Sequence, residues 1–291
     1  MRVLEAVGFG AGDEADFHPP TEHDPGGYRE HVMVWRACEL ALAAVGRSWD
    51  DPVGLDWAML DDSRRAEVST AIDHALARLS AHTPWVAKDP RLCLTLPLWR
   101  RAVNPICVMT HRYPLDVARS LAVRDSMPVF GGLALWEFYQ RAALKSSAGL
   151  SRVFVSFADL IATPGDVGAM LAERLRDVSA PNPWEPSSVG HDVIDGRLVR
   201  HRSGAWDQGA WLNPSQQRLF EAMEQAVIGA PGAGEALEVV AAEPVSEQAL
   251  EVLTTLARHR RRQAEMAQRD HEISAWNEHL QRELAGQSDS A

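Results

Sequence analysis

The sequence predicts an α/β fold, in which a parallel β-sheet flanked by helices is followed by a helical tail. Short apolar runs at Trp85–Ala87, Ile106–Met109 and Val153–Phe157 alternate with helical patterns. This alternation is typical of parallel strands joined by helices. The chain is 46% hydrophobic and 24% charged, as in ordinary globular proteins. From Glu247 to Ala285 the pattern is helical and rich in charge.

The N-terminal part is expected to be helical with one polar loop. Met1–Gly8 resembles the last turns of a helix that ends at a glycine. Asp13–Tyr28, rich in Pro, Gly and His, is expected to be a loop. Apolar residues recur at helical spacing in Glu30–Ala44 and Arg64–Ser80, which we expect to be amphipathic helices.

Further helices are expected between and after the strands, at Leu92–Arg101, Pro114–Arg124, Phe130–Ser147, Pro164–Leu175 and Pro214–Ile228. The domain organisation is expected to be an α/β domain at 1–230, a Gly- and Ala-rich linker at 231–246 and a helical tail at 247–291. The tail has a loose apolar stripe, too irregular for a coiled coil, at Leu253, Leu256, Met266, Ile273 and Leu280. It either packs on the domain or mediates association into homo-oligomers.

Composition excludes several classes of function. A net charge of −11 argues against broad binding to nucleic acid or anionic membranes. No apolar run has the length of a membrane span. The three cysteines lack CxxC spacing, so buried thiols and a reducing, cytoplasmic location are expected.

Two cations follow predicted strands and indicate an anion site. Lys88, one of only two lysines, follows the run at 85–87, and Arg112 follows the run at 106–109. After Arg112, the pair Tyr113-Pro114 leads into a helix. A helix N-terminus offers free N–H groups and a positive dipole end, so it attracts the same anion as the arginine.

These residues resemble the sulfotransferases that use 3′-phosphoadenosine 5′-phosphosulfate (PAPS) as sulfate donor. The segment His111–Ser120 is similar to the family's 3′-phosphate motif, and Phe157–Leu160 is similar to its Tyr-Glu-Asp-Leu segment. Arg200–Arg202 resembles a late basic segment of the family, and Lys88–Arg91 is similar to the bacterial branch. The resemblance covers about residues 13–202 and implies a P-loop-like parallel sheet.

The resemblance also implies roles for individual residues. Arg112 and Ser120 would bind the 3′-phosphate of the donor, with help from Arg200 or Arg202, and Phe157 would contact the adenine. This agrees with the residue types, because a guanidinium grips phosphate with a planar fork and a hydroxyl adds a further donor.

Catalysis by this family needs a base near the acceptor. Many relatives place a histidine two positions after the strand-end lysine, and this chain has Pro90 there. Glu30, Asp89 and His23 are the candidates, in that order, and Lys88 would stabilise charge that develops on the sulfonate or the leaving phosphate. The chemistry requires no metal, and the acceptor would be a small molecule or a glycan.

The chain departs from the family at its start. Relatives open with a strand and a Gly-, Ser- and Thr-rich loop that holds the 5′-phosphosulfate, and Met1 stands where the following helix should be ending. We therefore expect an N-terminally shortened sulfotransferase fold. Either the start site is misassigned or the chain trimmed, or the natural chain has lost this strand and its activity.

Two other classes of function compete with the enzyme. One is a non-catalytic protein of the same fold that binds an adenine nucleotide, or binds a partner through its tail. The loss of the loop favours it, and the retention of Arg112, Ser120 and Lys88 counts against it. The other is a nucleotide kinase, which would need a GKS or GKT loop that the sequence lacks.

Overall fold

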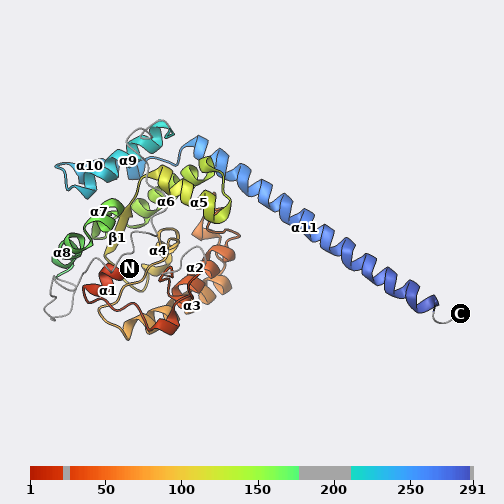
Figure 1. The fold of residues 1–291 in the computed structure, drawn as a ribbon. Helices are drawn as coiled ribbons and strands as arrows, with labels where there is room; N and C mark the ends of the chain where they lie inside the picture. The colour runs from red at the N-terminus through yellow and green to blue at the C-terminus, as the bar shows by residue number, and fades with distance from the viewer. Residues whose placement is uncertain (22–26, 177–210, 289–291) are drawn as a thin grey trace.

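The computed structural model describes residues 1–21, 27–176 and 211–288, with side chains through residue 276. The described chain is a mixed α/β structure, mostly helical, with a small two-stranded parallel sheet (Figure 1). Its elements, in chain order, are α1 (Arg2–Ala6), η1 (Glu14–Asp16), α2 (Val32–Ala44), η2 (Trp57–Met59), α3 (Asp62–Ser80), α4 (Leu92–Trp99), β1 (Cys107–His111), α5 (Pro114–Asp125), α6 (Val129–Ser146), β2 (Arg152–Ser156), α7 (Phe157–Ala162), α8 (Pro164–Arg174), α9 (Pro214–Val227), α10 (Ala233–Ala242) and α11 (Glu247–Ser288).

The two strands run parallel, from Cys107 opposite Arg152 to His111 opposite Ser156. Helices α5 and α6 form the crossover between them and pack closely on each other. The close approach depends on Gly132, because a Cβ atom there would lie 2.7 Å from Cα of Ala118 in α5. The pairing confirms two of the three predicted strands and their parallel direction.

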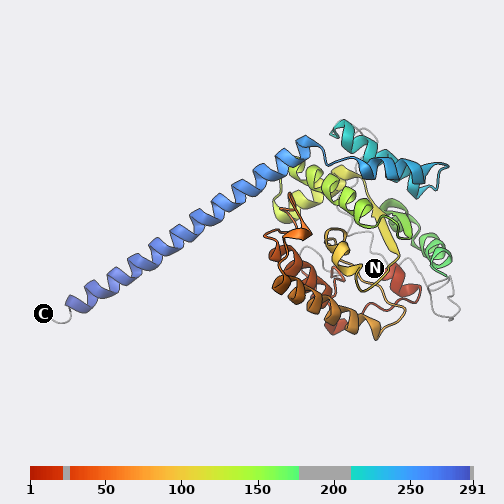
Figure 2. The same ribbon diagram turned by 180° about the vertical axis from the view of Figure 1, so that it is seen from behind.

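Helices α2, α3 and α4 form a helical layer beside the sheet, around one apolar core (Figure 2). Polar caps set where these helices begin. The Nδ1 atom of His31 accepts a hydrogen bond from the backbone N–H of Met33, and Asp61 accepts one from Arg64. Capping of this kind satisfies N–H groups that the first turn leaves free. The sequence pattern predicted that the helix begins at Glu30. In the structure it begins at Val32, so Glu30 precedes α2 and does not lie in its first turn.

The short helix α1 packs against α8 and shares a core cluster with β2. It ends at Ala6, and Gly8 follows its C-cap residue Val7; the φ of +100° at Gly8 allows the N–H of Phe9 to reach the carbonyl of Leu4. A glycine is favoured there because side chains are strained in this region. The helix end predicted at Met1–Gly8 is confirmed.

Helix α10 packs on α9 and on α6, and α9 packs on the two strands. The residues of α10 that are buried are Ala233, Leu237 and Val240. The range 231–246, expected to be a linker, thus contains a helix that belongs to the core.

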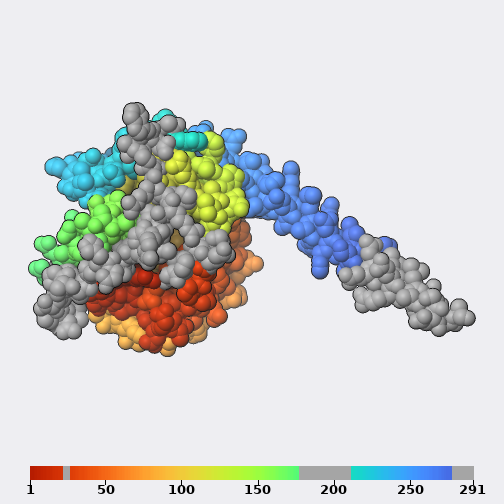
Figure 3. Space-filling view, in the orientation of Figure 1, coloured from red at the N-terminus to blue at the C-terminus, as the bar shows by residue number. Residues whose placement is uncertain are grey.

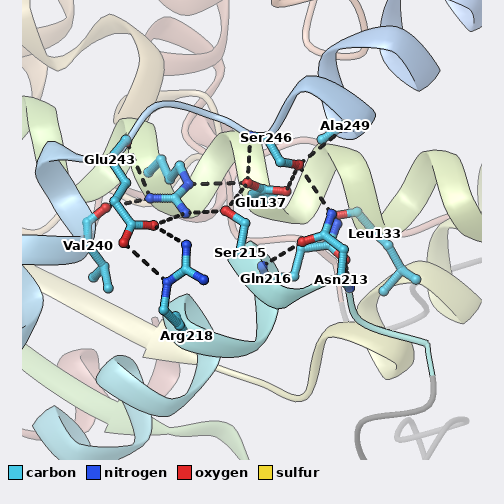
Figure 4. Close-up of polar contacts among 11 residues, drawn as sticks. Leu133, Glu137, Asn213, Ser215, Gln216, Arg218, Val240, Glu243, Ser246 and Ala249 are labelled. Atoms are coloured by element: carbon cyan, nitrogen blue, oxygen red, sulfur yellow. Dashed lines mark hydrogen bonds and ion pairs between the residues drawn. The ribbon is translucent and has the colours of Figure 1, made fainter.

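A buried polar network joins α6 to α9, to the end of α10 and to the start of α11 (Figure 4). Glu137 of α6 is fully buried, and it accepts hydrogen bonds from Arg141, from Ser215 of α9 and from Ser246 just before α11. Arg141 also donates to the side chain of Glu243, just after α10. Two helices and the start of a third are thereby fixed to α6.

The segment Trp85–Ala87, predicted to be a strand, forms only one bridge. The N–H of Gly10 bonds the carbonyl of Pro84 at 2.8 Å, and the N–H of Val86 bonds the carbonyl of Gly10 at 2.8 Å. The segment is extended, but within the described residues it pairs with no strand of the sheet. The predicted sheet is therefore smaller than expected, and a P-loop-like sheet is not established by these strands.

Helix α11 leaves the body of the protein and projects from it as a single rod (Figures 1 and 2). Its first turns pack on α6 through Ala249, Leu253 and Ala257, which are buried. Among the described residues, no helix is long and apolar enough to cross a membrane.

Candidate functional site

Arg112 and Phe157 meet at the carboxyl ends of the two strands. Each follows the last residue of its strand, and these last residues, His111 and Ser156, are opposite each other in the parallel register. The guanidinium carbon of Arg112 lies 4.5 Å from the centre of the Phe157 ring. An arginine at this distance over an aromatic face makes a cation–π contact. Parallel pairing therefore brings together two residues predicted separately from the sequence.

The start of α5 adds to the positive character of this point. Pro114 occupies the first turn of α5, directly after Arg112 and Tyr113. Burial lowers the pKa of Arg112, and the nearby carboxylate of Asp116 opposes that change. An arginine pKa starts above about 12, so the side chain stays charged at neutral pH. Ser120, half-buried, lies in the second turn of the same helix.

A buried histidine that the sequence analysis did not select lies beside Arg112. His111 has 3% of its surface exposed, and its Nε2 atom is 2.7 Å from a carboxylate oxygen of Glu224 in α9. Phe220 of α9 contacts both the His111 ring and the Tyr113 ring. Burial lowers the pKa of His111, and Glu224 opposes this effect. More than a hundred residues separate these partners, so no local pattern could have paired them.

Lys88 and Glu30 form the second group of predicted residues. The Nζ atom of Lys88 donates to Oε1 of Glu30 at 2.8 Å and to the backbone carbonyl of Tyr28 at 3.0 Å. The Lys88 side chain is 40% exposed, whereas that of Glu30 is 14% exposed. An NH2 nitrogen of Arg91 lies 4.0 Å from the other oxygen of Glu30. The Glu30 carboxylate is thus flanked by two cations.

Asp89 is buried and its carboxylate is engaged by Arg91. Oδ1 accepts hydrogen bonds from the backbone N–H and from Nε of Arg91, both at 2.8 Å, and Oδ2 accepts one from an NH2 group of Arg91. Arg91 also contacts Glu39 and lies over the Trp35 ring. These contacts give Asp89 a role in holding the loop before α4. Its role as a base stays a prediction.

Some predicted residues cannot be placed. Arg200 and Arg202, predicted to close over the 3′-phosphate, and His23, a candidate base, lie outside the described residues. The structure therefore relates Arg112 to Phe157 and Lys88 to Glu30. It leaves the late basic segment as a prediction.

One group in the described residues has the geometry of a metal site. Ligand atoms of Asp13, Asp16 and His82 lie within 4.8 Å of one another. The carboxylate of Asp16, however, already accepts hydrogen bonds from Arg78 at 2.8 and 3.2 Å. The arginine lowers the pKa of Asp16 and neutralises its charge. A cation would have to displace this arginine, so we assign the group a structural role.

Comparisons with known proteins gave no match for this chain, whether to a family model, to a curated protein or to a solved structure.

Proposed function

We propose that this protein transfers a sulfuryl group from PAPS to a hydroxyl or amine of a small molecule or glycan. The observation that carries the proposal is the pair Arg112 and Phe157 at adjacent strand ends, 4.5 Å apart, at the N-terminus of α5. An aromatic ring beside a guanidinium and a helix N-terminus fits an adenine nucleotide that carries a phosphate. In an open α/β sheet, ligands bind at the carboxyl ends of the strands.

In the proposed mechanism, Arg112 and Ser120 hold the 3′-phosphate while Phe157 contacts the adenine. The acceptor oxygen or nitrogen forms a bond to sulfur, and the bond between sulfur and the 5′-phosphate oxygen breaks. Glu30 takes the proton of the acceptor, and 3′-phosphoadenosine 5′-phosphate (PAP) leaves with the electron pair of the broken bond. Lys88, which holds Glu30, stabilises negative charge on the leaving phosphate.

Calorimetric titration tests the nucleotide half of the proposal. We expect the protein to bind PAP more tightly than AMP, since the pair at the strand ends recognises the additional 3′-phosphate. Arg112→Ala should weaken PAP binding by about tenfold or more, because a hydrogen bond to a charged group contributes about 1.5–3 kcal/mol. AMP binding should change little.

Arg174→Ala is the matched control, because it removes an exposed arginine from α8. It should leave both affinities unchanged. Equal affinities for PAP and AMP in the wild-type protein would contradict the proposal. A fall in the melting temperature of Arg112→Ala, with the PAP preference intact in the folded fraction, would make Arg112 structural.

A protein that binds the nucleotide without transferring sulfate is the second candidate. It is favoured by the ion pairs of the predicted catalytic group, in which Lys88 engages Glu30 and Arg91 engages Asp89. Incubation with PAPS labelled in its sulfate, with and without a panel of hydroxyl and amine acceptors, separates the two. Labelled product or free sulfate above the background of Arg112→Ala supports the enzyme. Tight PAP binding without turnover supports the second candidate.

A further inference from the structure

Helix α11 has two parts that differ in their surroundings. Its first turns pack on α6, and Arg260 and Arg261 then form ion pairs with Asp50 and Asp51 of the body. From residue 262 to residue 276 every side chain is exposed. The space-filling view shows this part well clear of the body (Figure 3). At 1.5 Å per residue, the stretch from 262 to the end of the helix at 288 is about 40 Å long.

The projecting part carries large apolar side chains on one face. Met266, Ile273 and Trp276 are 64%, 58% and 63% exposed. They are separated by seven and then three residues. Over this part of the helix, unlike the whole stripe that begins at Leu253, the spacing is the a, a, d spacing of a coiled-coil seam. In proteins, most of the stability of a helix comes from packing of its apolar face against a neighbour. Such a seam indicates that the projecting helix packs against another helix.

We infer that the partner is a second copy of this chain, and that the two α11 helices pair antiparallel as a homodimer. The charges of the projecting part favour a copy of itself over a membrane or nucleic acid. Arg262 and Arg269 are balanced by Glu265, Asp270 and Glu272, so the surface has no excess of positive charge. A helix with mixed charge along a narrow seam matches the pairing of two like helices.

Two contacts of a parallel pair favour the antiparallel arrangement. Arg269 lies seven residues before Trp276 and therefore occupies the same d position in the seam. In a parallel pair in register, it meets Arg269 of the second copy. Glu265 at the edge of the seam would face Asp270 of the second copy. Both contacts join like charges, which destabilises the parallel form.

Reversing one helix removes both of these contacts. The twofold axis then passes level with residue 271 and brings Asp270 and Glu272 near their own copies, so the gain comes from Arg269, which lies among these carboxylates. With Met266 of one copy opposite Trp276 of the other, Arg269 comes level with Glu272 and Ile273 of the second copy. The guanidinium can then pair with the carboxylate while its aliphatic stem covers the isoleucine. The twofold axis generates each of these contacts twice, and it places the two bodies at opposite ends of the paired helices.

Sedimentation equilibrium of the full chain tests the dimer. The wild-type protein is expected to be a dimer that dissociates on dilution. The variant Met266→Gln/Ile273→Gln/Trp276→Gln keeps helix-forming residues and is expected to be a monomer at concentrations where the wild type is dimeric. Ala264→Gln/His271→Gln changes the opposite face of the same helix and is expected to remain a dimer.

A monomeric wild-type chain at all concentrations would overturn the inference, as would a dimer that survives the triple substitution. Unchanged thermal unfolding of the body shows that the triple variant is folded. A monomeric opposite-face variant would mean that loss of helix, and not of the seam, separates the copies.

Cross-linking tests the direction of the pair. Chains with Met266→Cys and chains with Trp276→Cys are mixed and mildly oxidised. The antiparallel arrangement gives covalent dimers in the mixture but not in either chain alone. Dimers in each separate chain, at the level seen in the mixture, would show a parallel pair. The wild-type chain, with free Cys38, Cys93 and Cys107, sets the background.

Discussion

At the scale of single residues, Glu30 is the predicted base whose surroundings fit catalysis best. Its carboxylate is mostly buried and held by Lys88 at 2.8 Å, whereas both oxygens of Asp89 are engaged by Arg91. If Glu30 accepts the acceptor proton, Glu30→Gln should lower sulfate transfer by about a hundredfold or more. PAP affinity should be retained, because Glu30 is not one of the residues proposed to bind the 3′-phosphate.

The measurement is transfer of labelled sulfate beside calorimetry with PAP. Glu67→Gln, an exposed carboxylate of α3, is the matched control and should leave both readouts unchanged. Loss of PAP binding together with activity would show that Glu30 supports the fold of the site and does not act as the base.

His111 makes stability depend on pH. Burial lowers its pKa, so the folded state favours the neutral ring while the unfolded chain takes up a proton near pH 6.5. The contribution of His111 is therefore fully present above about pH 6.5 and is lost as the pH falls toward its lower folded pKa. His31 is buried too, and its pKa changes in the same direction. We expect the free energy of unfolding to fall between pH 7 and pH 5.

Urea unfolding at several pH values measures this effect. His111→Gln should flatten the pH dependence, although it lowers stability at pH 8. The exposed His74 provides the control, because His74→Gln should leave the slope against pH unchanged. A slope unaffected by His111→Gln would assign the acid sensitivity to His31 or to other groups.

At the scale of elements, the sequence predicted helices better than strands. An amphipathic helix shows its pattern within its own residues, and most of the expected helices are present within a few residues of their predicted bounds. The run at 85–87 has the composition of a strand, but strand formation requires a partner, and among the residues that the structure describes only Gly10 bridges to it. Spacing could have found α10, because Ala233, Leu237 and Val240 recur at helical intervals.

Within the candidate site, the sequence predicts best the residues that directly follow a strand. Arg112 is predicted from its place after a strand, and Phe157 from the resemblance to the sulfotransferase segment. The parallel register then explains why they meet. The pair His111 and Glu224 depends on how α9 crosses the end of β1, which no local pattern contains.

The contact between α5 and α6 is set by glycine, and it positions the helix that follows Arg112. A Cβ atom at Gly132 would lie 2.7 Å from Cα and 2.9 Å from Cβ of Ala118. We expect Gly132→Ala to force the helices apart and to lower stability by about 1–3 kcal/mol, as overpacking does. PAP affinity should also fall, because α5 carries Ser120.

Gly234 of α10 is the matched control, since a Cβ atom there meets no atom within 4 Å. Gly234→Ala should leave PAP binding unchanged and stabilise the protein by up to about 1 kcal/mol, because alanine favours helix over glycine. Urea unfolding and calorimetry check both variants. Equal effects of the two substitutions would mean that the close approach of α5 to α6 is not required.

At the scale of the whole molecule, the network around Glu137 connects the α/β body to the projecting helix (Figure 4). The carboxylate has no exposed surface, and Ser246, the residue before α11, donates to it from both its backbone N–H and its hydroxyl at 2.8 Å. The direction in which α11 leaves the body therefore depends on a buried charge and its partners. Arg141 provides the opposite charge at 3.2 Å.

Glu137→Gln tests this connection. The amide keeps the shape of the side chain but brings N–H donors toward the donors of Arg141 and Ser246, and it leaves the arginine without its buried counter-charge. Removing one partner of a buried ion pair costs about 3–5 kcal/mol, so urea unfolding should show a loss of that size. Glu238→Gln, which removes a 63% exposed partner of Arg152, should cost about 1 kcal/mol or less. A small effect at Glu137 would mean that apolar contacts of α11 with α6, such as that of Leu253, suffice to anchor the helix through which we propose that the chain dimerises.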